Sequence, residues 1–245
     1  MRDERPSSAA AIERVRLSDT IYGRLLNEIV GAGYQIGDRL PTEHQLAEHF
    51  AVSRPVVREA LRRLQTDGIV VSRQGSGTYV QRKPSQRVVE LTGNAPGLGE
   101  VLQGFELRLS LEPLSARLAA RNRSDAQLDA IVSAAAALRD AFTAGVSRDA
   151  EKDADYAFHR TIAEASGNAL LVDVLDGIAE RLKDGMRVTL SLTHDASEQR
   201  RARVLDEHER IVHAIGVGDP DSAEIAMRYH LDQARNRLLD GQLDR

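Results

Sequence analysis

Residues 40–68 read LPTEHQLAEHFAVSRPVVREALRRLQTDG, and this stretch decides how the N-terminal part of the chain folds. Its apolar residues recur at helical spacing on both sides of a short break at 51–53, which predicts two helices joined by a tight turn. Thr42 and Gln45 have the spacing of a capping box, in which each side chain bonds the backbone of the other residue. The first helix is therefore expected to begin directly after Thr42.

The second helix has start and stop signals of its own. Ser53 is placed to act as its N-cap, and Pro55 falls in the first turn, where a missing N–H group costs nothing. Gly68 suits the left-handed conformation that often follows a last helical residue. Four apolar residues at helical spacing are expected to face the core, namely Val57, Ala60, Leu61 and Leu64. Two capped helices around a short turn form a helix-turn-helix.

Three arginines follow one another at intervals of four on the outer side of the second helix: Arg54, Arg58 and Arg62. Consecutive members are about 6 Å apart along the helix axis, given a rise of ~1.5 Å per residue. A row of this kind is commonly a solvated charged face. Arginine is also the side chain that binds guanine edges and phosphates with paired hydrogen bonds, and the surrounding helix-turn-helix favours this second interpretation.

The next stretch, IVVSRQGSGTYVQ, predicts a β-hairpin. Residues 69–71 and 78–80 are rich in strand-forming side chains, and the glycines of 75–77 suit a turn. A hairpin directly behind a recognition helix is called a wing. Its tip would present Arg73 and Gln74 to a DNA backbone or minor groove, although a purely structural hairpin has the same pattern.

Together these motifs resemble the winged helix of the GntR family of bacterial transcription regulators, over about residues 17–82. The resemblance implies that this domain binds operator DNA and that the wing tip enters the minor groove. The implied DNA contacts lie in the two helices and the wing: Thr42, His44, Ser53, Arg54, Arg58, Arg73, Gln74 and Gly75. His44 stands where the family usually has an arginine, and Pro55 stands where serine or threonine is common.

Composition excludes several classes of protein. The chain has no cysteine, which rules out a disulfide framework and a thiolate metal site. It has no stretch near the ~20 apolar residues of a membrane span. It also lacks the apolar core of a signal peptide, so a cytoplasmic location without membrane attachment is expected.

Charge is distributed unevenly along the chain. The whole sequence has a net charge of −4, but residues 1–84 contain 13 basic and 10 acidic residues, whereas the remainder contains 20 and 27. A mildly basic first part joined to an acidic second part agrees with specific recognition of DNA rather than general coating of nucleic acids.

The 245 residues are enough for one small and one larger domain. We expect a disordered leader, a winged helix-turn-helix domain, a linker and a helical domain at residues 1–16, 17–83, 84–100 and 101–240. The first helix of the winged domain is expected to run from an N-cap at Ser18 to Gly31. Within the linker, residues 87–100 fit either a short additional helix or a connection.

From residue 101 the pattern is helical almost to the end. The predicted helices span 101–121, 125–143, 149–166, 168–191, 197–216 and 219–240. Helices of this length with short connections form an all-α bundle, here of six or seven helices. The predicted fold class is therefore mainly α, with an N-terminal winged helix-turn-helix and a C-terminal helical bundle.

Three histidines and one aspartate of the helical domain could form a metal site. His159 follows Asp155 by four residues, so their side chains share one face of a helix. His208 and His230 lie near the apolar seams of their own helices. An Asp–His pair is commonly a surface ion pair, but a bundle could bring all four side chains together. Such donors suit Zn²⁺, with Ni²⁺ or Mn²⁺ as alternatives, and not Ca²⁺ or Mg²⁺.

Four stretches of this domain are similar to the FCD effector domain of the FadR-type subgroup of the GntR family: FELRLSLEPLSARLAA, DYAFHRTIAEASGNALL, EHERIVHAI and MRYHLDQA. Many members of that subgroup hold a metal ion with one aspartate and three histidines. These ligands match Asp155, His159, His208 and His230. Open positions on the metal typically accept the carboxylate of a small organic or sugar acid.

The same resemblance implies that Arg108 and Asn168 line the effector site. Arg108 could instead pair with Glu106 or Glu112, and Asn168 could cap a helix end.

The sequence thus predicts a homodimeric, metabolite-responsive repressor that binds a short palindrome of double-stranded DNA. An enzyme is the main alternative, because a metal with open positions could activate water, with Glu207 or Glu209 as base. An enzyme has no use for a winged helix, however, and we expect no catalytic activity. In a third interpretation the protein binds DNA and the metal is purely structural.

Overall fold

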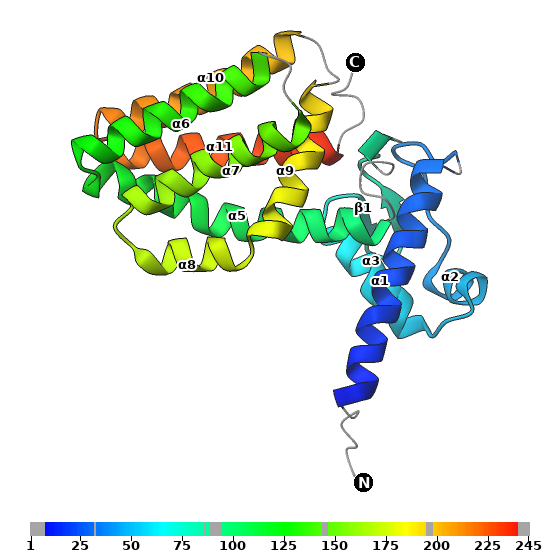
Figure 1. Cartoon of the computed structure of the whole chain (residues 1–245). Helices are drawn as coiled ribbons and strands as arrows, with labels where there is room; N and C mark the ends of the chain where they lie inside the picture. The colour runs from blue at the N-terminus through cyan, green and yellow to red at the C-terminus, as the bar shows by residue number, and fades with distance from the viewer. Residues whose placement is uncertain are drawn as a thin grey trace. The chain divides into compact units, whose positions relative to one another are not determined.

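The computed structural model describes residues 8–31, 33–85, 87–88, 95–143, 147–194 and 198–239 of the chain. They belong to two compact units whose boundary in the sequence lies between Gly99 and Glu100. The first unit is built around three helices and a two-stranded sheet, and the described part of the second is helical (Figure 1). The predicted fold class, a winged helix-turn-helix followed by a helical bundle, is confirmed.

The core of the first unit lies between α1 (Ser8–Gly31) and α3 (Arg54–Thr66), with α2 (Glu43–Phe50) packed against α3. Its fully buried side chains come from all three helices and include Tyr22, Leu26, Ile29, Leu46, Val57 and Leu64. The buried Tyr22 hydroxyl donates a 2.8 Å hydrogen bond to Asp67, directly after α3. This bond ties α1 to the end of α3.

The predicted capping box of α2 is confirmed. Gln45 N donates to Thr42 Oγ1 over 3.3 Å, and Thr42 N donates to Gln45 Oε1 over 2.9 Å. After α2 the chain turns through Ala51, which has a left-handed backbone with φ of 53°. Ser53 then occupies the N-cap position of α3, but its side chain makes no capping hydrogen bond, so that part of the prediction is wrong.

The wing consists of β1 (Val70–Arg73) and β2 (Gly77–Val80), which pair antiparallel with Val70 opposite Val80. The hairpin prediction is confirmed, with strands that reach slightly further toward the turn than expected. The segment before α2 joins the edge of β2, because Leu40 N donates to Thr78 O over 2.8 Å. This bond fixes the start of the helix-turn-helix to the wing.

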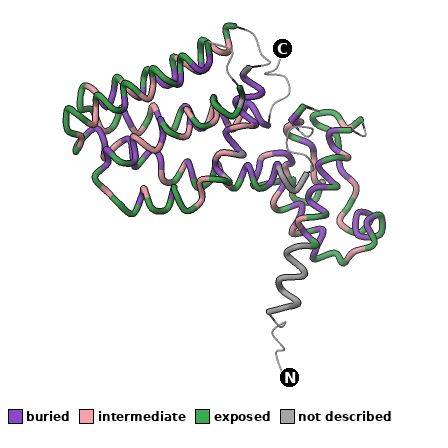
Figure 2. Tube along the Cα trace, in the orientation of Figure 1, coloured by how far each residue is buried: buried purple, intermediate pink, exposed green. Residues whose placement is uncertain are grey.

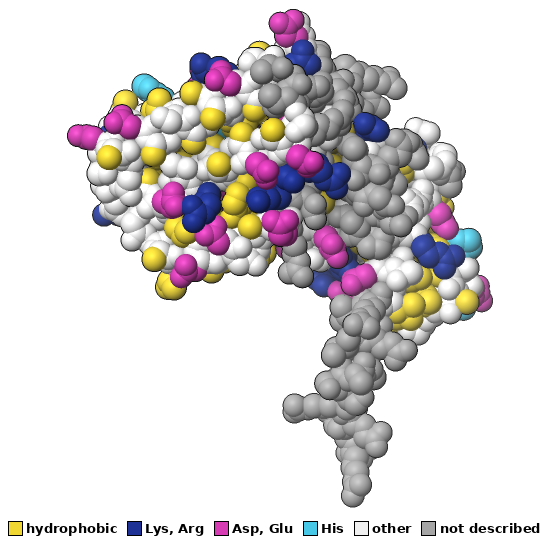
Figure 3. All heavy atoms as spheres, in the orientation of Figure 1, with side chains coloured by type: hydrophobic (Ala, Val, Ile, Leu, Met, Phe, Trp, Pro, Cys, Tyr) yellow, Lys and Arg dark blue, Asp and Glu magenta, His cyan; other side chains and the backbone are white. Residues whose placement is uncertain are grey.

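The second unit contains α5 (Ala95–Asn122), α6 (Asp125–Thr143), α7 (Arg148–Ala165), α8 (Ala169–Gly177), α9 (Ala179–His194), α10 (Glu198–Gly216) and α11 (Pro220–Leu239). Helix α7 packs against α6, α8 and α9, and α10 packs against α6. Figure 2 shows buried and exposed positions alternating along these helices, as expected for a bundle whose helices each bury one face. Acidic and basic side chains are intermixed on the face of this unit that Figure 3 shows.

Two helices begin well before their predicted starts. Helix α1 begins at Ser8, so residues 8–16 of the expected leader are helical and Ser18 is a buried residue within the helix. Helix α5 begins at Ala95, inside the expected linker. Residues 87–88 are also helical, whereas the rest of 86–94 lies outside the described residues.

The helix predicted over 168–191 is two helices. It is interrupted at Ile178, whose φ of −117° and ψ of 11° are not helical. Ile178 N bonds to Leu175 O over 3.3 Å, which is the tightened last turn typical of a helix end. The preceding Gly177 favours an end here because glycine is a poor helix former.

Within the described residues, no helix has both the length and the apolar character needed to span a bilayer.

Candidate functional site

The outer face of α3 carries the arginine row. Arg54, Arg58 and Arg62 are each more than half exposed. Arg58 is held by Glu43, the first residue of α2, with 2.8 Å between Nη2 and Oε2. Arg62 pairs with Glu59 on its own helix at 2.6 Å. The row is therefore open to a partner, and its members are oriented by neighbouring carboxylates.

The other residues expected to contact DNA lie at the start of α2, directly before α3 and in the wing. Thr42 uses its side chain in the capping box, and His44 is exposed 3.5 Å from Glu48. Ser53 is exposed with a hydroxyl that the helix cap does not use. In the wing, the Arg73 guanidinium lies 4.7 Å from the centroid of the Tyr79 ring. Gln74 and Gly75 form the exposed turn.

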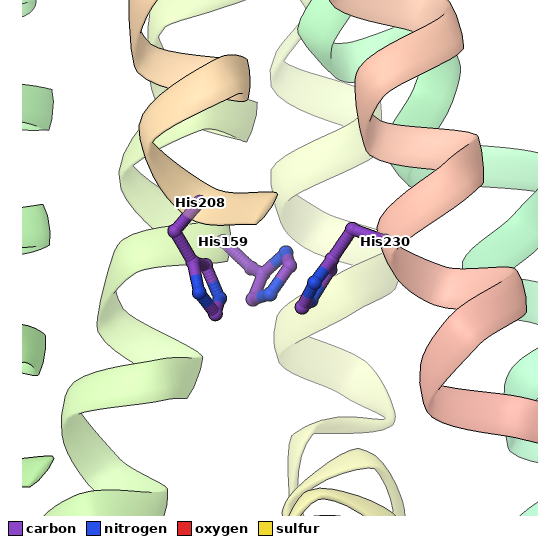
Figure 4. A group of neighbouring side chains, drawn as sticks. All are labelled: His159, His208 and His230. Atoms are coloured by element: carbon purple, nitrogen blue, oxygen red, sulfur yellow. The ribbon is translucent and has the colours of Figure 1, made fainter. Parts of the chain in front are cut away.

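The second unit contains a buried cluster of three imidazoles. His159 comes from α7, His208 from α10 and His230 from α11, and the three rings point toward one another (Figure 4). One ligating nitrogen of each lies within 4.8 Å of those of the other two. All three residues are at most 4% exposed.

Asp155 lies one turn before His159 on α7 and is also buried. Its Oδ1 atom is 3.4 Å from His208 Nε2 and 3.9 Å from His159 Nε2. Burial opposes ionisation of this carboxyl, but the two imidazoles and Arg108 outweigh it and hold the pKa of Asp155 below its usual range. The structure therefore brings together all four residues that the sequence suggested as metal ligands.

Hydrogen bonds at Nδ1 hold two of the three imidazoles, and the third has a close carboxylate contact there. His208 Nδ1 lies 2.8 Å from the carbonyl oxygen of Val204, which can only accept a hydrogen bond. His159 Nδ1 lies 2.7 Å from Glu112, and His230 Nδ1 lies 2.9 Å from Glu207. With the proton on Nδ1, the Nε2 lone pairs of His208 and His230 are free. This is the arrangement of histidines that bind metals, whose second nitrogen typically donates to a carboxylate or carbonyl.

Two arginines extend these contacts outward. Arg108, 4% exposed, bonds Glu112 with 2.5 Å between Nε and Oε1. Burial opposes ionisation of Glu112, yet Arg108 and His159 outweigh it and lower the pKa of its carboxyl to about 2. On the other side, Arg237 is buried and lies 3.4 Å from Glu207.

The two arginine pairs are not equally well neutralised. Burial lowers the pKa of Arg237 and raises that of Glu207, because one long contact does not compensate for the loss of water. Arg237 Nε is also buried without a hydrogen-bond partner in the described part of the chain. Arg108, by contrast, is well neutralised by the charge of Glu112 beside it.

Sequence reasoning did not identify the supporting roles of Glu112, Glu207 and Arg237. The spacing of Arg108 and Glu112 did indicate an ion pair, but no pattern connects either residue with His159. Asn168 acts as the N-cap of α8, with Oδ1 accepting from Leu170 N over 3.1 Å. His213, on the same helix as His208, is exposed and lies outside the cluster.

The four donors fit a divalent first-row ion. Among the described residues, both ring nitrogens of His159 and Nε2 of His208 are buried without a hydrogen-bond partner. A polar atom left in this state typically costs ~1–3 kcal/mol, so a ligand for these nitrogens is expected. Two ligands bound to one ion at about 2.1 Å can be up to about 4.2 Å apart. The ring nitrogens lie within 4.8 Å of one another, so they need only a small inward movement to bind one ion.

A winged helix-turn-helix joined to a helical bundle with a buried histidine cluster is the architecture of a DNA-binding protein with an additional helical domain. Residues 17–80 match the family of bacterial regulatory proteins known as the gntR family, and residues 103–233 match the FCD domain. The chain therefore belongs to the GntR family of transcription regulators, in the subgroup that carries an FCD domain.

Two relatives at 30% identity or more support this assignment. The HTH-type transcriptional regulator LutR of Bacillus subtilis (strain 168) is 34% identical over 204 residues, which cover 82% of this chain and 92% of that protein. The HTH-type transcriptional repressor NanR of Escherichia coli (strain K12 / DH10B) is 30% identical over 226 residues, covering 90% and 84%. The solved structure of Streptococcus agalactiae GntR is 30% identical, covers 89% of this chain and 99% of that chain, and has a TM-score of 0.48.

These families and relatives are regulators of transcription, not enzymes. The metal-dependent enzyme considered from the sequence is therefore set aside.

Proposed function

We propose that the protein is a cytoplasmic, homodimeric repressor that releases or retains its operator according to the level of a small organic or sugar acid. In this proposal the helical unit binds a divalent metal ion, and the metal binds the carboxylate of the acid. The observation that carries the proposal is the convergence of one ring nitrogen from each of three buried imidazoles. In His208 and His230 the Nδ1 atom lies against a hydrogen-bond acceptor.

The proposed ligands of the metal are Asp155, His159, His208 and His230. Zinc is our first choice, with nickel or manganese as alternatives, because imidazole and carboxylate donors suit these ions. The metal supplies a Lewis acid for carboxylate oxygens. Glu207 holds the proton on Nδ1 of His230 and so keeps its opposite nitrogen available, and Glu112 lies 2.7 Å from Nδ1 of His159, where it favours the same tautomer.

Two buried arginines support an anionic effector. Arg108 is expected to contact it, and Arg237 is the second candidate because its charge is only partly neutralised. A bound carboxylate would supply the negative charge that Arg237 lacks. We infer that the effector carries at least one carboxylate together with hydroxyl or further acidic groups.

The proposed DNA contacts are those of α2, α3 and the wing. Two copies of the winged unit would bind the halves of a short palindrome, since a two-fold dimer matches a two-fold site. Light scattering during size-exclusion chromatography tests the dimer, and sequences selected by the protein from random duplexes test the palindrome. A monomer that selects an asymmetric site would contradict this part of the proposal.

Helix α5 could couple effector binding to DNA binding. It begins near the sequence boundary of the units and carries Arg108 and Glu112 about four turns further on. A shift of these side chains on effector binding would move the helix that follows the winged unit. The effector can act in this way only if it binds the two states of the dimer with different affinity.

Thermal unfolding in a matrix of metals and acids tests the proposal. Protein stripped with a chelator is measured alone, with Zn²⁺, Ni²⁺ or Mn²⁺, and with each metal plus organic or sugar acids. We expect the metal to raise Tm and one class of acid to raise it further only when metal is present. Stabilisation by metal without any response to acids would favour a structural metal, and no response to metal would overturn the site.

A further inference from the structure

A single carboxylate holds two members of the arginine row. Arg58 Nε lies 3.1 Å and 3.2 Å from the two carboxylate oxygens of Glu43, and its Nη2 lies 2.8 Å from Oε2. Arg54 Nη2 lies 4.0 Å from the same Oε2. Glu43 belongs to α2 and both arginines to α3, so these contacts depend on the angle that the helix-turn-helix sets.

The contact leaves most of the Arg58 guanidinium available. It uses the edge formed by Nε and Nη2, and three of the five N–H donors of an arginine lie outside that edge. The Arg58 side chain remains 62% exposed, whereas that of Glu43 is 31% exposed. The carboxylate therefore supports the guanidinium from the protein side while the outer N–H groups stay open.

Such a pair contributes little to stability, because exposed ion pairs are typically worth ~0–1 kcal/mol. We expect the pair to affect DNA binding more than it affects stability, for two reasons. A free arginine loses about 2 kcal/mol of rotamer entropy when it is fixed, and part of this loss has already occurred in the pair. The negative charge also offsets one of the two positive charges that would otherwise bind any phosphate.

We propose that Glu43 determines the specificity of DNA binding by positioning Arg58 and Arg54 for base edges and by weakening their contacts with phosphates of unrelated DNA. Specificity is a difference between two affinities, and Glu43 acts on both of them. It favours the selected site through orientation and disfavours other sites through charge. This inference goes beyond the proposed effector response and rests only on the DNA contacts of α3.

The full-length Glu43→Gln variant tests this proposal. The probes are a duplex that the wild-type protein selects from a random pool and a scrambled duplex of equal length, titrated over a range of salt concentrations. We expect the ratio of the two affinities to fall about tenfold, within the range given by one bidentate base contact. For the scrambled duplex, the slope of log K against log salt should steepen by about one phosphate contact.

Glu59→Gln is the matched control, since it removes the same charge beside Arg62, which is not among the DNA contacts that the family resemblance implies. It should leave the affinity ratio unchanged. Equal ratios for both variants and the wild type would overturn the proposal. Glu43→Asp keeps the charge but shortens the side chain, so it should lose affinity for the selected duplex without gaining affinity for the scrambled one.

Two further measurements separate other causes. If Glu43→Gln lowers Tm strongly, the Asp variant, which retains the charge at the start of α2, decides whether orientation matters. The Arg58→Ala variant should lose its affinity for the selected duplex. Retention of that duplex by Arg58→Ala would overturn the contact assignment and this inference with it. Loss of the duplex in Arg58→Ala, together with unchanged specificity in Glu43→Gln, would overturn the inference alone.

Discussion

At the scale of the residue, the histidine cluster depends on the separate use of the two ring nitrogens. His208 shows this most clearly, because Val204 O fixes its proton on Nδ1 and leaves a buried Nε2 facing the other donors. Replacement of His208 by alanine should reduce metal affinity at least about 100-fold, beyond the 10–100-fold typical for loss of an outer hydrogen-bond partner. Metal content after dialysis measures the effect.

The matched control for this prediction is His213→Ala, one and a half turns further along α10 and exposed to solvent. It should keep a full complement of metal. Both variants should bind the selected DNA duplex, since neither residue belongs to the winged unit. A stoichiometric metal ion in the His208 variant would contradict the proposed site.

Asn168 poses a different question at the same scale, because it was expected either to line the effector site or to cap a helix. Its side chain caps α8, so Asn168→Ala should lower the stability of the second unit by about 1 kcal/mol. Asn168→Ser should restore most of the loss, since serine is also a good N-cap. We expect both variants to keep the thermal response to the acid. Loss of that response with unchanged Tm would instead support a role in effector binding.

At the scale of the element, one buried hydrogen bond joins α1 to the end of α3, in addition to the ion pair between Arg63 and Asp19. The Tyr22 hydroxyl is fully buried and donates to Asp67, and burial together with that carboxylate raises the pKa of Tyr22. The tyrosine therefore keeps its proton, and the bond persists, throughout the ordinary pH range. Tyr22→Phe should cost about 1.5–3 kcal/mol, as expected for a hydrogen bond to a charged group.

Hydrogen exchange measures this loss locally. Amides in the middle of α1 should exchange about 10- to 100-fold faster in Tyr22→Phe, if the unit opens as a whole. The control is Tyr79→Phe, whose hydroxyl bonds Ser76 at the exposed wing and contacts neither helix. Unchanged protection of α1 in the Tyr22 variant would show that the remaining contacts, which include the Arg63–Asp19 ion pair, hold the junction without this bond.

The elements themselves were largely predictable from the sequence where local signals are strong. The spacing of Thr42 and Gln45 located the start of α2, and helix α6 has the predicted bounds. The break at Ile178 was missed because Gly177 is a weak signal within an otherwise apolar helical pattern. The start of α1 at Ser8 was missed because Ser18 was interpreted as an N-cap and the residues before it as a disordered leader.

The candidate site was predictable only in part, for a related reason. Helical periodicity places His159, His208 and His230 on buried faces, and the family resemblance groups them. Neither of these signals predicts which carboxylate contacts which imidazole. The contacts of Glu112 and Glu207 with the histidines join different helices, so they depend on the three-dimensional packing of the bundle.

At the scale of the whole molecule, the two units differ in charge in the way their proposed partners require. Residues 1–84 are mildly basic and the remainder is acidic, so the chemistry of DNA binding is concentrated in the winged unit. The buried arginines of the second unit are a local exception, because they lie beside the carboxylates and imidazoles of the cluster. A repressor of this design needs coupling between the units.

That coupling can be tested by its reciprocity. If the acid weakens binding of the selected duplex by some factor, the duplex must weaken binding of the acid by the same factor, because the two events share one thermodynamic cycle. We expect a factor of about 5–150, as is typical of such coupling. Fluorescence anisotropy gives the DNA affinity with and without acid, and calorimetry gives the acid affinity with and without DNA. In chelator-treated protein the DNA affinity should persist and the effect of the acid on it should vanish. An acid effect that survives removal of the metal would place the effector away from the histidine cluster.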